Sequence, residues 1–381
     1  MSAISAFSFP TAIRFGAGAR HEVAKHLVDQ RLSRPLVVTD RGFAGLPPFA
    51  AFVESLTAGG LRSATFAGVH GNPVESQVGA GVAAFREHEA DAIIGIGGGA
   101  ALDVAKAIAV MASHPGALFD YEDGRVGALP IDRPLPYWVA LPTTAGTGSE
   151  VGRSAVIADE RTHVKRIVFS PRLMARAVFA DPELTIGLPP PVTAATGMDA
   201  LTHCIEAFLA KDWHPICDGV ALEGMRLAAV NLERAVRDGS DLEARSGMLM
   251  ASMMGAIAFQ KGLGVCHSCA HALSAVANLH HGLANGVMID HALRHNLVCA
   301  SGRFRLIARA LELARDDGAA VIAWLAQLKQ AIGIPARLSA AGVTRDDLPR
   351  LVDLAMADGC HQNNPAPCAR DDFVRIFEQA W

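Results

Sequence analysis

Charged residues are scarce in this sequence, and they form no block of like charge. They make up 19% of the 381 residues, and the formal net charge is −4. Proteins usually bind nucleic acids and anionic membranes through clustered lysine and arginine, so we expect neither as a partner. The expected partners are small molecules.

The sequence also lacks the marks of export and of a membrane span. Its opening, MSAISAFSFPTAIRFGAG, has no basic stretch followed by an apolar one, and no uninterrupted apolar run is long enough to cross a bilayer. Cysteine is limited to seven residues, an odd number, and several of them fall in predicted helices. This favours reduced thiols over a disulfide framework. We therefore expect a cytoplasmic protein.

The length and the 36 glycines are typical of a two-domain α/β enzyme. In the first half, short apolar runs alternate with helical patterns, which predicts strands joined by crossover helices in a mostly parallel sheet. The clearest predicted strands are residues 35–39 (PLVVT), 92–97 (AIIGIG) and 137–141 (YWVAL), with further short strands at 154–158, 166–169 and 177–180.

After Asp181 the pattern changes to long amphipathic helices with few β-branched runs. These helices should start beyond residues 188–191 (LPPP), which we interpret as a linker because consecutive prolines interrupt regular structure. The predicted fold is an α/β dinucleotide-binding domain at residues 1–185, followed by an all-α domain at residues 186–381.

A glycine-rich turn follows the predicted strand at 92–97. Residues 95–103 read GIGGGAALD and run directly into a helical pattern. Three consecutive glycines allow close approach of a ligand to the backbone, and the free N–H groups of a helix N-terminus attract phosphate. Glycine turns also occur for packing alone, and the spacing is not that of the usual dinucleotide fingerprint.

A second loop strengthens the nucleotide hypothesis. Residues 142–150 (PTTAGTGSE) also follow a strand and are rich in hydroxyls and glycines. Two such loops at the carboxyl edge of one sheet would face a common ligand. Asp40, at the end of the PLVVT strand, could accept hydrogen bonds from a ribose 2′-hydroxyl and would repel a 2′-phosphate, which favours NAD over NADP. Its alternative role is that of a helix cap.

Histidine and aspartate spacing predicts a metal site in the second half. Asp199 and His203 are four residues apart in a helical pattern and so share one helix face, and His267 and His271 repeat that spacing. His281 follows within Leu279-His-His-Gly282. Three imidazoles and one carboxylate suit Fe(II) or Zn(II) and are too rich in nitrogen for magnesium or calcium. Each histidine alone could instead be a buried structural residue.

Taken together, these motifs resemble those of the iron-containing (group III) alcohol dehydrogenases over nearly the full chain. They occur in the order of that family: residues 9–16 (FPTAIRFG), GIGGG, PTTAGTGSE, Asp181-Pro182, residues 194–203 (AATGMDALTH), His267, His271 and His281-Gly282. The resemblance implies hydride transfer between NAD(H) and a primary alcohol or aldehyde. It also implies that the cofactor and the metal lie in the cleft between the two domains.

The resemblance also implies roles for individual residues. The metal ligands would be Asp199, His203, His267 and His281, with iron as the metal and zinc as the alternative. His280 is a competing candidate, but the histidine directly before glycine matches the family. His271 would lie beside the metal as a proton relay or substrate contact. The residues lining the cofactor would be Asp40, Gly97, Gly98, Gly99, Thr143, Thr144, Thr147 and Lys165.

Some features depart from the family, and related activities stay open. Ala100 stands where the family often has serine after GGG, which removes a possible phosphate hydroxyl but no backbone donor. The same two-domain build resembles glycerol dehydrogenases, maleylacetate reductases and the lyase dehydroquinate synthase, so a polyol or keto acid is an alternative substrate. A non-catalytic metal-binding relative is a further alternative. By analogy with the family, we expect a homodimer or a larger homo-oligomer.

Overall fold

The computed structural model describes residues 11–162 and 164–381, which form two compact units. Phe9 and Pro10 of the first motif lie outside the described residues. The α/β unit comprises the described part of 9–144 together with 149–185. The helical unit comprises 145–148 and 186–381. Residues 145–148, in the middle of the PTTAGTGSE loop, therefore pack with the second unit.

A six-stranded parallel sheet forms the centre of the α/β unit. Its order is β1-β8-β5-β4-β2-β3, and every neighbouring pair is parallel. The strands are β1 (Ala12–Phe15), β2 (Pro35–Asp40), β3 (Ala64–Val69), β4 (Ala92–Gly97), β5 (Tyr137–Pro142) and β8 (Ala177–Ala180). The parallel sheet and four of its strands confirm the predicted α/β fold. Strands β1 and β3, both at edges of the sheet, were not singled out.

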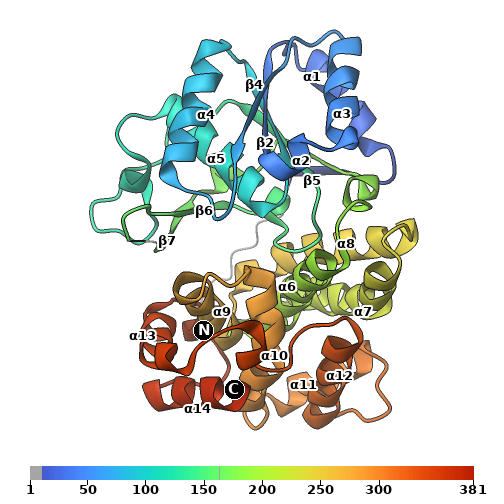
Figure 1. Ribbon diagram of the computed structural model, residues 1–381, viewed down its shortest axis with the longest axis vertical. Helices are drawn as coiled ribbons and strands as arrows, with labels where there is room; N and C mark the ends of the chain where they lie inside the picture. The colour runs from blue at the N-terminus through green and yellow to red at the C-terminus, as the bar shows by residue number, and fades with distance from the viewer. Residues whose placement is uncertain (1–10, 163) are drawn as a thin grey trace. The chain divides into compact units, whose positions relative to one another are not determined.

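Helices cover both faces of this sheet. On one face, α1 (Val23–Asp29) and α3 (Pro47–Ala58) pack on alternate strand residues such as Val37 and Ile94 in one hydrophobic core. On the other face lie α4 (Glu75–Glu87) and α5 (Gly99–Ser113) (Figure 1). Since both faces are covered, the central strands are continuous apolar runs, which is why the sequence revealed them.

The remaining strands of this unit form a separate hairpin. β6 (Ser154–Ala158) and β7 (Lys165–Phe169) pair antiparallel in a two-stranded sheet. Helix α2 (Arg41–Ala44) is a single turn after β2. The predicted strands at 154–158 and 166–169 are therefore present, although they do not join the main sheet.

The second half of the chain is helical, as the change of pattern after Asp181 predicted. Helix α6 packs against α7, α8 and α10, and α9 packs against α10 and α13. The helices are α6 (Pro190–Leu209), α7 (Pro215–Arg237), α8 (Leu242–Ala258), α9 (Val265–Val276), α10 (His281–Asn296), α11 (Ser301–Ala310), α12 (Gly318–Ala331), α13 (Leu348–Ala357) and α14 (Arg370–Ala380). Within the described ranges, no single helix has the length and apolarity of a membrane span; the bent pair Leu242–Lys261 and Val265–Val276 passes that test jointly, by length and composition.

The interpretation of residues 188–191 as a linker was wrong at its C-terminal end. Helix α6 begins at Pro190, with Pro189 at the N-cap position. The first residues of a helix have no intrahelical acceptor for their N–H groups, and the fixed φ of proline is already helical. Pro190 and Pro191 therefore start α6 instead of delaying it.

Candidate metal centre

Four potential metal ligands converge within the helical unit. Asp199 and His203 lie on α6, His267 lies on α9, and His281 is the first residue of α10; these helices lie side by side in Figure 1. One ligand atom from each residue lies within 4.8 Å of the others. Asp199 and His203 share a face of α6 because they are four residues apart. The structure thus brings together the four residues named from the sequence.

A glycine allows α10 to begin against α6. A Cβ atom at Gly282 would lie 2.3 Å from the carbonyl oxygen of Ala195 and 3.2 Å from the Cβ of Asp199. No larger residue fits there unless the helices separate. Because Gly282 follows His281 directly, this close approach brings the His281 Nε2 to 3.4 Å from Oδ1 of Asp199. The His-Gly pair in the sequence therefore has a steric basis.

Glu206 orients the imidazole of His267. Its Oε2 lies 2.6 Å from Nδ1 of His267, and its two oxygens also accept hydrogen bonds from the backbone N–H groups of Gly264, Cys266 and His267. The carboxylate thus satisfies the N-terminus of α9 and directs Nε2 of His267 to the cluster. The sequence analysis missed Glu206. Its signal was present, because residue 206 follows His203 by one helical turn.

Asn285 lies against three of the four candidate ligand atoms. Its Nδ2 donates to Oδ1 of Asp199 at 2.8 Å and lies 3.3 Å from Nε2 of both His267 and His281. The side chain is fully buried. Asn285 was also missed, although it follows His281 by four residues on α10. It holds the spacing of the cluster through one amide group.

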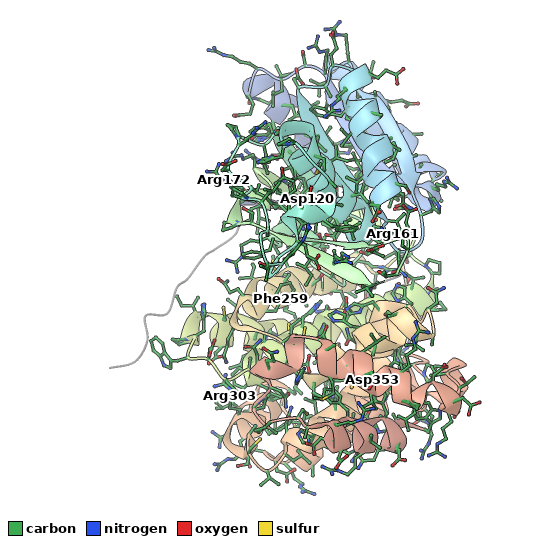
Figure 2. All side chains as sticks on the ribbon, turned by 90° about the vertical axis from the view of Figure 1, so that its left-hand side faces the viewer. Asp120, Arg161, Arg172, Phe259, Arg303 and Asp353 are labelled. Carbon is green, nitrogen blue, oxygen red and sulfur yellow. The ribbon has the colours of Figure 1, made fainter. Side chains whose placement is uncertain are left out.

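The donor set fits a divalent transition metal. One carboxylate and three imidazoles suit iron or zinc, and burial favours the neutral imidazole whose lone pair a metal needs. Burial lowers the pKa of His203 to about 4, so this ring is neutral near pH 7. Phe259, labelled in Figure 2, packs on the same ring with centroids 5.1 Å apart.

His271 lies beside the cluster. Its ring stacks on that of His281, with centroids 5.2 Å apart, and Nδ1 lies 2.7 Å from Oδ2 of Asp358. The side chain of His271 is 30% exposed, in contrast to the buried His203 and His267. Asp358 was missed because 87 residues separate it from His271 and no local pattern links them.

Several of the expected cofactor residues meet at the carboxyl edge of the parallel sheet. A pocket of about 320 Å³ there is lined by Asp40, Gly98 and Ala100, among others. Asp40 ends β2 and caps α2, its Oδ1 accepting from the N–H of Phe43 at 2.9 Å. The two predicted roles of Asp40, helix cap and ribose contact, are compatible, because capping uses one oxygen and the residue still lines the pocket.

Glycine is required at the end of β4. Gly97 has a φ of +152°, and a Cβ on it would lie 2.6 Å from the Cβ of Ala101 and 3.0 Å from Oδ2 of Asp40. Gly98 is the N-cap of α5, which begins at Gly99. The absence of side chains thus keeps the N-terminus of α5 accessible from the pocket.

The GIGGG turn after β4 and the PTTAGTGSE loop after β5 are adjacent where they leave the sheet. The N–H of Thr143 donates to the carbonyl of Gly97 at 3.0 Å, and a Cβ on Gly98 would lie 3.3 Å from Cγ2 of Thr144. Of the eight predicted cofactor residues, only Asp40 and Gly98 line the 320 Å³ pocket. Thr147 belongs to the helical unit and Lys165 begins β7. The others outside the lining are Gly97, Gly99, Thr143 and Thr144.

A buried network supports the PTTAGTGSE loop within the α/β unit. Nζ of Lys106 donates to Oγ of Ser149 at 2.7 Å, and that hydroxyl donates to Oδ1 of Asp103 at 2.6 Å. Burial lowers the pKa of Lys106 and raises the pKa of the neighbouring Glu150 to about 7. The sequence analysis noted this loop for its hydroxyls and missed its charged support.

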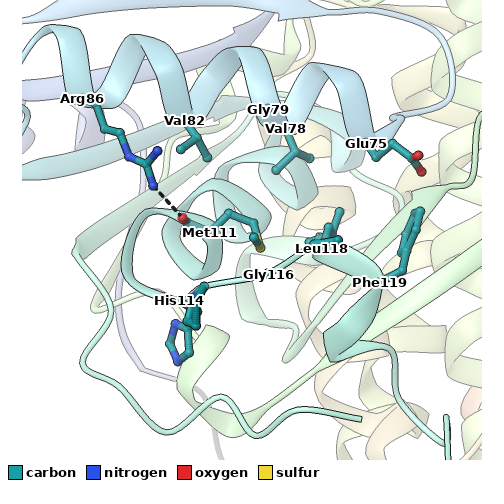
Figure 3. Close-up of a pocket in the computed structure, with 12 residues that line it drawn as sticks. Glu75, Val78, Gly79, Val82, Arg86, Met111, His114, Gly116, Leu118 and Phe119 are labelled. Atoms are coloured by element: carbon teal, nitrogen blue, oxygen red, sulfur yellow. Dashed lines mark hydrogen bonds between the residues drawn. The ribbon is translucent and has the colours of Figure 1, made fainter. Parts of the chain in front are cut away.

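A larger pocket of about 450 Å³ lies on α4 and the segment after α5 (Figure 3). Arg86 points across it to the carbonyl of Met111, at 3.5 Å. The ring nitrogens of His114 are bonded to the carbonyl of Val110 and the N–H of Arg133. Of the two metal-ligating clusters found in the described residues, neither lies here.

Comparison with known proteins gives consistent matches. The family model described as iron-containing alcohol dehydrogenase matches residues 10–182, and the model of the C-terminal part of that family matches residues 193–381. A 4-hydroxybutyrate dehydrogenase of Cupriavidus necator is 39% identical over 358 residues, which cover 92% of each chain.

Solved structures agree with these matches. A crystal structure of 1,3-propanediol oxidoreductase has a TM-score of 0.94 and 36% identity, covering 99% of this chain and 100% of the other. Sulfoacetaldehyde reductase from Bifidobacterium kashiwanohense, solved in complex with NAD+, has a TM-score of 0.90 and 28% identity, covering 100% of this chain and 99% of the other.

Proposed function

Because the chain belongs to the iron-containing alcohol dehydrogenase family and is an alcohol oxidoreductase, we propose that it transfers hydride between NAD(H) and a primary alcohol or aldehyde. The observation that carries this proposal is the convergence of Asp199, His203, His267 and His281 within 4.8 Å. These four residues would hold one divalent metal ion, iron first and zinc as the alternative. The three relatives named above act, by their names, on terminal alcohols or an aldehyde.

The metal ion, when bound, would act as a Lewis acid on the substrate oxygen. The protein's own part is to fix the ligands and to move a proton. Oδ2 of Asp358 accepts a hydrogen bond from Nδ1–H of His271, so in the neutral ring Nε2 is the nitrogen without a proton. His271 is therefore our candidate for the proton relay, accepting a proton at Nε2 during alcohol oxidation and returning it during aldehyde reduction.

The carboxyl edge of the sheet supports NAD as the cofactor. The turn formed by Gly97, Gly98 and Gly99 offers backbone N–H groups at the start of α5, which suits a pyrophosphate. The carboxylate of Asp40 faces the same pocket and would accept from a ribose 2′-hydroxyl, whereas it would repel a 2′-phosphate. Thr143 and Thr144 adjoin this turn; Thr147 and Lys165 stay in the proposal by family resemblance alone.

We also propose a division of roles between the two domains, a cytoplasmic location and a homo-oligomeric state. Residues 1–185 would bind NAD and residues 186–381 would hold the metal; the described units change between Thr185 and Ile186. Seven free cysteines support a reducing, cytoplasmic location. A homodimer or larger assembly is proposed from the family, and light scattering of the purified chain would test it.

The first experiment is NADH oxidation by anaerobically purified protein, stripped of metal and reloaded with Fe(II) or Zn(II). The substrate panel contains short aldehydes, hydroxyaldehydes and keto acids, and the substrate preference separates alcohol dehydrogenase from polyol or keto-acid activity. We expect metal-dependent oxidation with aldehydes. NADH binding without oxidation under any metal would favour the lyase or the non-catalytic alternative and would contradict the proposal.

A further inference from the structure

A second cluster of metal-ligating side chains lies beside the proposed metal centre. One ligand atom from each of His271, Asp358 and Cys360 lies within 4.8 Å of the others, and all three residues are partly accessible. His271 belongs to α9, and Cys360 begins a single-turn 3-10 helix, Cys360–Asn363, that packs on α9. This cluster shares no residue with the set of Asp199, His203, His267 and His281.

Asp358 is held rigidly at the centre of this cluster. Its Oδ1 accepts from Oγ of Ser268 at 2.7 Å and from the N–H of Cys360 at 2.8 Å, while Oδ2 faces Nδ1 of His271. Burial opposes the charge, but the hydrogen bonds from His271, Cys360 and Ser268 hold the pKa of Asp358 well below its usual range. The carboxylate is therefore charged and fixed in place.

The three donors differ in kind, which narrows the choice of cation. An imidazole nitrogen, a carboxylate oxygen and a thiol sulfur form the mixed N/O/S set that zinc accepts, and three protein ligands leave a fourth position for water. Magnesium and calcium, which prefer oxygen, do not suit this set. Burial and the charge of Asp358 raise the pKa of the Cys360 thiol, so the sulfur carries a proton when no cation is present.

We propose that His271, Asp358 and Cys360 form a second site, which binds Zn²⁺ or a similar borderline cation and inhibits the enzyme. On binding, Cys360 gives its thiol proton to solvent and bonds the cation through sulfur. Nδ1 of His271 bonds the cation as well, and its proton moves to Nε2. The inhibition rests on the proposed function, because His271 then has no free nitrogen to accept the relay proton.

Cobalt absorption tests the binding separately from activity. Co²⁺ bound to a thiolate gives a sulfur-to-metal charge-transfer band in the near ultraviolet. The first centre, formed by Asp199, His203, His267 and His281, contains no cysteine. We expect the band to appear as Co²⁺ is added beyond one equivalent. It should vanish in Cys360→Ser and persist in Cys299→Ser, which changes an exposed cysteine. Absence of the band, or its survival in Cys360→Ser, would overturn the site.

Zinc inhibition tests the consequence. With iron in the first centre, Zn²⁺ should inhibit NADH oxidation, and Cys360→Ser should need at least about tenfold more Zn²⁺, since even indirect support of a metal ligand is worth about 10- to 100-fold in affinity. Equal inhibition of both proteins would assign the effect to exchange at the first centre and refute the inhibitory role. If neither the parent chain nor the variant oxidises NADH, the proposed function fails. The cobalt band still shows whether the second site binds a cation.

Discussion

The two candidate binding regions are built by different parts of the chain. At the carboxyl edge of the sheet, the binding groups are backbone N–H groups made accessible by Gly97, Gly98 and Gly99, three consecutive residues. In the helical unit, the binding groups are side chains from three helices. A backbone site fails when a side chain is added, whereas a side-chain site fails when one is removed.

The largest expected effect is on the side-chain site. His281→Ala should lose bound metal and reduce kcat by at least about a thousandfold, because Lewis-acid assistance contributes several kcal/mol and each 1.36 kcal/mol is about tenfold in rate. Metal analysis and NADH oxidation measure the two losses. The matched control is His280→Ala, since His280 precedes α10 and lies outside the cluster. If His280→Ala loses the metal and His281→Ala keeps it, the ligand assignment is wrong.

Burial favours the neutral form of a titrating group, so it shifts the pKa of a histidine and of a glutamate in opposite directions. It keeps His203 neutral, as a ligand should be, but it raises the pKa of Glu150 from 4.5 to about 7. The folded protein keeps the His203 ring neutral, so the contribution of His203 to the free energy of unfolding rises with pH. Glu150 is more protonated in the folded protein than in the unfolded chain, so its own contribution falls as pH rises from about 4.5 to 7. The loss is on the order of 3 kcal/mol, from about 1.4 kcal/mol per pKa unit.

Glu150→Gln should remove this loss. Denaturant unfolding at pH 5 and pH 8 gives the change in the free energy of unfolding for each protein, and from pH 5 to pH 8 this change should be more positive in the variant than in the parent chain. Glu54→Gln, at an exposed position of α3, is the control and should show the same change with pH as the parent chain. An equal change with pH in Glu150→Gln and in the parent chain would show that Glu150 is charged in the folded protein.

Adding one methyl group should break the backbone site. Gly97→Ala forces a Cβ to within 2.6 Å of Ala101, at a φ of +152°, so we expect a loss of about 1–3 kcal/mol in stability and weaker NADH binding. Gly79→Ala in α4 is the matched control, because its Cβ would meet nothing within 4 Å. Helix propensity should make that variant about 0.5–1 kcal/mol more stable. NADH fluorescence titration and denaturant unfolding distinguish the two outcomes.

Burial also explains which elements of the fold could be predicted from the sequence. Strands β2, β4 and β5 were predicted because both faces of the sheet are covered, which makes each strand a continuous apolar run. β1 and β3 lie at the edges, where exposed residues dilute that pattern. The start of α6 was misplaced because proline acts differently at the first turn of a helix and inside it.

In the candidate sites, the sequence predicted the metal ligands but not the residues that hydrogen-bond to them. Local spacing paired Asp199 with His203, and the family resemblance added His267 and His281. Long-range partners left no local pattern: 87 residues separate Asp358 from His271, and 61 separate Glu206 from His267. Such pairs become visible only when the helices are packed.

The smallest expected effect comes from one of these unforeseen partners. Glu206→Gln keeps the size of the side chain but removes the charge that holds Nδ1 of His267 and the N-terminus of α9. Metal affinity should fall about 10- to 100-fold, the usual cost of losing a carboxylate behind a histidine ligand. Competition with a chelator measures this change, and Glu223→Gln, on α7, is the control. An unchanged metal affinity would mean that packing alone orients His267. The metal site would then tolerate the loss of a supporting side chain, contrary to the comparison drawn above.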